Sequence, residues 1–102
     1  MIVIELGLST VGGQTQVTPK EDQNTRQGLT SLRRGDSFVI GTAGLVPVSI
    51  GFRDPAPFPI KYGEQITVPQ TAPTGRFRYD CSLRDQNGNI FSSGGGEVEI
   101  GQ

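Results

Sequence analysis

Few side chains in this sequence could do redox or metal chemistry. Cys81 is the only cysteine, and the 102 residues include no histidine. A thiolate is a nucleophile and a metal ligand, and Arg78 and Arg84 would lower the pKa of Cys81 if they lay close to it. The alternation instead places Cys81 on the same side of a strand as Tyr79 and Leu83, where cysteines usually pack as small hydrophobic residues. We therefore expect a buried, structural Cys81, and keep a thiol-based redox or metal-handling role as an alternative.

Carboxylates are present, but not in the pattern of a catalytic or metal site. Asp85-Gln86-Asn87-Gly88-Asn89 resembles part of a calcium loop, yet it lacks the alternating acids and the bidentate glutamate of such loops. Turn formation explains these residues more simply. Without histidine, and with no Ser or Cys beside an evident base, no general acid–base or nucleophilic pair can be assembled. We expect no enzyme, no catalytic or metal-binding residue, and no cofactor.

Two charged motifs also have a plain structural interpretation. Arg34-Gly35-Asp36 is the tripeptide that integrins recognise, which requires an exposed tight turn, but Gly-Asp is also ordinary turn chemistry. Lys20, Arg26, Arg33 and Arg34 are interleaved with acids, and the chain has a net charge of −1. Such a mixture provides no basic face, so we expect no nucleic-acid partner.

The segment from Arg53 to Ile60 is the one we select for partner recognition. Its three prolines exclude it from a central strand and stiffen it. Phe58, between two prolines, could be held outward as an anchor, because aromatic anchors are typical of interfaces. Alternatively, Phe58 folds inward and closes one end of the molecule, and the sequence leaves both possibilities open. The candidate partner-binding residues are Arg53, Asp54, Phe58 and Ile60.

Short strand-like blocks separated by turn residues follow one another along the chain. About seven or eight strands at this spacing predict an all-β sandwich or barrel. The polar stretch 19–34 predicts a long exposed loop or one helical turn, Asn87-Gly88 a type I′ hairpin turn, and Gly94-Gly95-Gly96 a hairpin or strand-crossing loop. The predicted core comprises Ile4, Leu6, Phe38, Ile40, Ile50, Phe52, Val68, Phe77, Tyr79, Cys81, Val98 and Ile100.

The last third of the chain resembles the cupredoxin family, the fold of plastocyanin and azurin. Thr74-Gly75-Arg76-Phe77-Arg78-Tyr79-Asp80-Cys81 is similar to the strand of that family that carries the cysteine, and Glu97–Ile100 to its closing strand. The likeness covers about residues 30–100 and implies a Greek-key β-sandwich, with an immunoglobulin-like sandwich as the competitor. A blue-copper site needs two imidazoles, a thiolate and a weak axial ligand. With no histidine, and Met1 as its only methionine, the chain acting alone cannot build that site, so we expect no copper.

The length of 102 residues fits a single domain over 1–102. No apolar run approaches the ~20 residues of a membrane span. The N-terminus has no basic region and is interrupted by Glu5, which argues against a signal peptide and favours the cytoplasm, with export after signal removal left open. We predict a non-catalytic, copper-free interaction module that binds a protein partner or itself through loops. The alternative is a structural or decoration domain of a larger particle, such as a phage or surface assembly.

Overall fold

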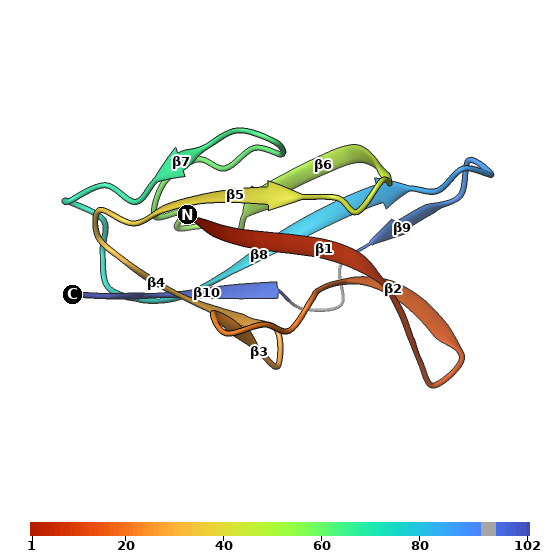
Figure 1. Ribbon diagram of the computed structural model, residues 1–102, viewed down its shortest axis with the longest axis horizontal. Helices are drawn as coiled ribbons and strands as arrows, with labels where there is room; N and C mark the ends of the chain where they lie inside the picture. The colour runs from red at the N-terminus through yellow and green to blue at the C-terminus, as the bar shows by residue number, and fades with distance from the viewer. Residues whose placement is uncertain (93–95) are drawn as a thin grey trace.

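The computed structural model describes residues 1–92 and 96–102, and these form ten strands and no helix. Figure 1 shows the strands in two layers. One sheet has the order β2-β1-β5-β7 and the other the order β3-β4-β10-β8-β6, with β9 also paired to β8. The all-β prediction is confirmed, although the strand number exceeds the expected seven or eight. The strands are β1 Ile2–Val11, β2 Gln14–Pro19, β3 Thr25–Arg26, β4 Leu29–Arg33, β5 Ser37–Gly41, β6 Val46–Phe52, β7 Ile66–Thr67, β8 Gly75–Arg84, β9 Ile90–Ser92 and β10 Gly96–Gly101.

Strand β1 pairs with two different strands along its length. Its first residues pair in parallel with β5, and the stretch from Leu6 to Val11 pairs antiparallel with β2. Gly12 and Gly13 connect the hairpin with φ of 59° and 80°, the backbone that a two-residue hairpin turn requires. The β1–β2 hairpin consequently projects from the body of the molecule (Figure 1).

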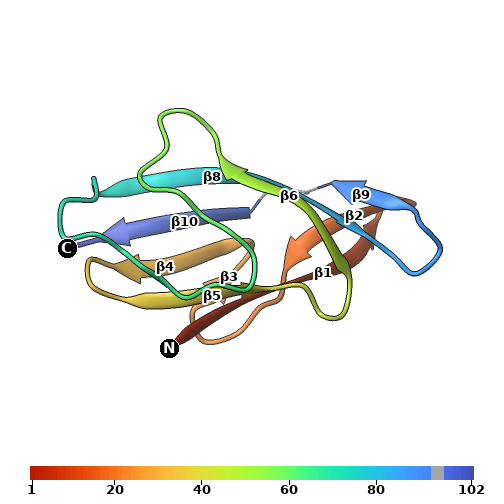
Figure 2. The same ribbon diagram turned by 90° about the horizontal axis from the view of Figure 1, so that it is seen from above.

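Strand β8 is the centre of the second sheet. Its alternation places Tyr79, Cys81 and Leu83 in the core, as the sequence predicts. Along one side β8 pairs first with β10 and then with β9, and along the other it pairs with β6. Figure 2 shows β9 beyond the start of β10, running back from the tip of the β8–β9 hairpin. Both hairpins thus leave the molecule at the same end, which we call the hairpin end.

The prediction of a loop or helical turn over 19–34 is wrong for its second half. After the loop that follows Pro19, the chain forms β3 and β4, joined at Gln27 and Gly28, which have φ of 52° and 81°. Thr25 and Thr30 face the core in these strands and share a hydroxyl–hydroxyl hydrogen bond of 2.7 Å. That bond satisfies two polar groups whose burial would otherwise be costly, so a polar sequence forms a buried strand pair.

The β8–β9 turn also differs from the prediction. It spans residues 85–89 and is not a two-residue Asn87-Gly88 turn. The Asp85 carboxylate accepts hydrogen bonds from the backbone N–H groups of Asn87 and Asn89, both at 2.9 Å, and stabilises the longer loop. Of the predicted glycine loop, Gly94 and Gly95 lie outside the described residues, and Gly96 is the first residue of β10.

Within the described ranges, one cluster of buried hydrophobic side chains lies between the two sheets. Of the predicted core residues, Ile50, Phe52 and Phe77 are only partly buried, and the other nine are buried. A Cβ on Gly96 would overlap the ring of Tyr79, its cross-strand partner, so the ring covers this glycine directly. The buried hydrophobic side chains outside that predicted set of twelve are Val17, Leu32, Phe58, Ile60, Ala72 and Leu83.

Candidate interaction surface

The Pro-rich segment after β6 turns its apolar side chains inward. Phe58 is 7% exposed, and its ring makes edge-to-face contacts with Phe38 and Phe52 at centroid distances of 6.0 and 5.3 Å. Ile60 is buried in the same cluster. This is the inward alternative of the two that the sequence leaves open. The buried side chains of Phe58 and Ile60 therefore present no anchor to a partner.

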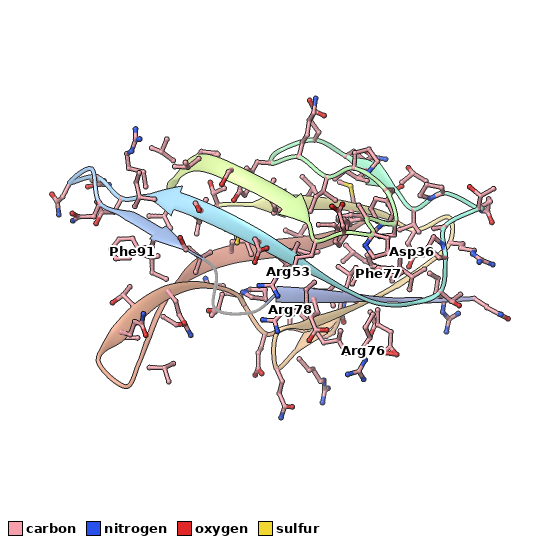
Figure 3. The ribbon with its side chains drawn as sticks, turned by 180° about the vertical axis from the view of Figure 1, so that it is seen from behind. Asp36, Arg53, Arg76, Phe77, Arg78 and Phe91 are labelled. Atoms are coloured by element: carbon pink, nitrogen blue, oxygen red, sulfur yellow. The ribbon has the colours of Figure 1, made fainter. Side chains whose placement is uncertain are left out.

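Arg53 and Asp54 are exposed, but they do not come together as a pair. Arg53 instead donates to Asp80, with Nε–Oδ2 at 2.9 Å and Nη2–Oδ1 at 3.0 Å. The hydrogen bond raises the pKa of Arg53 and lowers the pKa of Asp80. Figure 3 shows Arg53 beside Arg78 on the outer surface of the second sheet.

The Arg34-Gly35-Asp36 turn uses its charged groups within the molecule. The Arg34 Nε donates to the carbonyl oxygen of Ala72 at 2.8 Å, and the Asp36 carboxylate accepts the backbone N–H of Arg33 at 2.8 Å. Gly35 has φ of 87°, and a Cβ there would lie 3.0 Å from the Gln70 amide nitrogen. These contacts explain the tripeptide as turn chemistry.

Cys81 is 3% exposed, which confirms the prediction that it packs in the core. Half-buried Tyr62 lies close to it and donates its hydroxyl to the carbonyl oxygen of Ser49 at 2.7 Å. Burial raises the pKa of Tyr62, and the neighbouring Cys81 raises it further. In the described part of the chain, no three His, Cys, Asp or Glu residues are placed to hold a metal ion. No described helix could span a membrane either.

The outer surface of the second sheet holds a set of arginines that sequence reasoning missed. Strand pairing places six arginines and three carboxylates there. Cross-strand neighbours compensate much of this charge: Arg76 lies 3.6 Å from Glu99, and Arg78 is opposite Glu97. Exposed ion pairs of this kind contribute little to stability and make a solvated surface. The nine residues are Arg26, Arg33, Arg53, Arg76, Arg78, Arg84, Asp80, Glu97 and Glu99.

Arg84 has different cross-strand neighbours. It is opposite Val46 of β6 on one side and Ile90 of β9 on the other, and directly paired residues share a face of the sheet. Val46 is 50% exposed and Ile90 is 54% exposed. The adjoining row on the same face consists of Ser49, Ser82 and Ser92. At the hairpin end, the last cross-strand row on this face of the sheet therefore consists of the Arg84 guanidinium between two exposed aliphatic side chains.

Exposed apolar side chains gather in this part of the molecule. Among the described residues, five of the seven exposed large hydrophobic side chains belong to the two hairpins or to the start of β6. The edge of β6 is interrupted by Pro47 and by a β-bulge between Pro47 and Ser49. Both features hinder the pairing of a further strand with this edge. The exposed surface is thus suited to side-chain contact. The five residues are Leu8, Val11, Val46, Val48 and Ile90.

No family model, no curated protein and no solved structure matches this chain, so the candidate surface at the hairpin end rests on its own geometry.

Proposed function

We propose that this protein is a non-catalytic interaction module that binds a protein partner or itself through the hairpin end. The observation that carries the proposal is the gathering of exposed aliphatic side chains there, above all Val46 and Ile90 beside Arg84. Singly scattered exposed apolar residues are ordinary on protein surfaces, whereas five of the seven among the described residues lie at this one end. Burial of such side chains against a partner is the main favourable contribution to association.

The proposal also includes the type of β-sandwich to which the two sheets belong. A copper-free, cupredoxin-like Greek-key sandwich is supported by two sheets around one core and by the central strand that holds Phe77, Tyr79 and Cys81. The scaffold then serves to hold the two hairpins and β6 in a fixed relation. Function in this proposal lies in the surface that the scaffold presents, because one fold supports many activities.

Site-specific photocrosslinking tests the proposal. A benzophenone side chain at position 90 should give defined protein adducts in an extract of cells that express the chain, or a dimer with purified protein. The same group in place of exposed Thr71, in the loop before the start of β8 and thus at the opposite end of that strand, is the control. An absence of adducts at position 90, or the same adducts from both positions, would contradict the proposal. Replacement of an exposed side chain such as Ile90 changes stability by only about 0.5 kcal/mol, so the fold should persist.

A further inference from the structure

The exposed row at the hairpin end combines one charge with two apolar side chains. Arg84 ends β8, Val46 begins β6 and Ile90 begins β9. The guanidinium binds carboxylates in a planar, bidentate manner, and its methylene stem packs against aliphatic groups. Arginine is accordingly enriched among the residues that dominate binding energy at interfaces.

Arg84 differs from the arginines farther along the same face. Arg53 is held by Asp80, and Arg76 lies beside Glu99. Both direct cross-strand neighbours of Arg84 are apolar. The nearest acid in sequence, Asp85, directs its carboxylate to the backbone N–H groups of Asn87 and Asn89. Those hydrogen bonds lower the pKa of Asp85 and hold its carboxylate against the backbone of the turn.

We propose that the row Val46–Arg84–Ile90 binds a protein segment in which a carboxylate is flanked by apolar side chains. This inference rests on the proposed function and adds the chemistry of the partner. The carboxylate pairs with the Arg84 guanidinium, and its apolar neighbours cover Val46 and Ile90. The hydroxyl groups of the adjoining serine row lie beside the contact and can hydrogen-bond the backbone of the segment.

Charge complementarity favours an acidic protein segment over a nucleic acid. The carboxylates of Asp80, Glu97 and Glu99 are interleaved with the arginines of this face and would repel a continuous phosphate backbone. A segment with one carboxylate beside apolar groups would contact only the end of this face that holds Arg84. There the described cross-strand pairs place no acid opposite Arg84, so the carboxylate is not repelled. A guanidinium whose cross-strand neighbours are both aliphatic matches such a segment in charge and in polarity.

The test compares short peptides in a titration followed by amide chemical shifts. The probe is a blocked heptapeptide, Gly-Leu-Ser-Glu-Ser-Leu-Gly, whose leucines and glutamate share one face when the peptide is extended, and its isostere has Gln in place of Glu. Because an exposed ion pair contributes up to about 1 kcal/mol, the Glu peptide should bind about two- to fivefold more tightly. The shifts should centre on the residues around Arg84. Arg84→Gln should remove the difference between the peptides, whereas Arg76→Gln, on the same strand and face, should leave it intact.

Each other outcome overturns the inference. Equal binding of the two peptides, or a Glu preference that survives Arg84→Gln, removes the assigned role of Arg84. Shifts that centre elsewhere, or binding of neither peptide, remove the assigned site. Tighter binding of a single-stranded oligothymidylate through Arg84 would favour a nucleic acid as partner. Adducts from position 90 would still support the proposed function in all these cases, so the two failures are distinguishable.

Discussion

The contact between Gly96 and Tyr79 makes a sharp prediction about the core. Gly96 begins β10 and is paired with Tyr79 of β8, whose ring is 1% exposed and lies directly over the glycine. The Cβ of Gly96→Ala would overlap that ring, so the ring or the strand must move. Overpacking of this kind costs about 1–3 kcal/mol, a large part of the roughly 5–15 kcal/mol that stabilises a small domain. A loss of about 2 kcal/mol moves the urea midpoint by about 1 M with an unchanged slope.

Gly101→Ala is the matched control because Gly101 lies in the same strand. Its added Cβ would lie 3.9 Å from the Leu32 carbonyl oxygen, an ordinary contact. Urea unfolding followed by circular dichroism should place this variant within about 1 kcal/mol of the wild type, with any change toward greater stability. A double-mutant cycle with Tyr79→Leu should show that the cost of Gly96→Ala falls when the ring is absent. Equal stability of Gly96→Ala and Gly101→Ala would refute the packing argument.

Three further predictions concern the buried aromatic residues. Among the described residues the hydroxyl of Tyr79 has no hydrogen-bond partner, so Tyr79→Phe should leave the unfolding free energy unchanged or raise it by up to about 3 kcal/mol; a clear loss in urea unfolding would show a missing partner. Burial raises the pKa of folded Tyr79, so the unfolded chain releases this proton first, and stability should fall above about pH 10 by about 1.4 kcal/mol per pH unit. Chemical denaturation across that range should show a shallower fall for Tyr79→Phe, and the same slope in both proteins would contradict the assignment. Phe58→Ala should cost about 3–5 kcal/mol in thermal or urea unfolding, while Asp54→Ala, in the same exposed loop, should cost almost nothing; similar small effects of both would place Phe58 at the surface.

The parts of the fold that follow from local pattern could be predicted from the sequence. The period-2 alternation of β8 predicts which side chains face the core, and Cys81 lies there with Tyr79 and Leu83. Strand β4 was missed because Thr30 is polar, and only the hydroxyl bond to Thr25 makes its burial favourable. The direction of Phe58 could not be predicted, since prolines stiffen a loop without indicating which way its side chains point.

The candidate surface could not be predicted because it depends on the register between strands. Val46 lies 38 positions before Arg84 in the sequence, and no local pattern connects them. Their pairing depends on the bulge near Pro47. From Phe52 back to Ser49, the β6 residues pair with β8 in one register, and beyond the bulge the register is shifted by one residue. In the unshifted register Val46 would be opposite Asp85, and Arg84 would be opposite Pro47.

The bulge therefore has two consequences for the proposed site. It interrupts the β6 edge, which limits pairing with a further strand. It also moves Val46 into the row of Arg84 and Ile90, because a one-residue shift exchanges the faces on which side chains lie. A protected edge and an apolar, singly charged row thus arise from the same extra residue in β6. Because of this bulge, β6 is better suited to bind a partner through its side chains than through backbone hydrogen bonds at its edge.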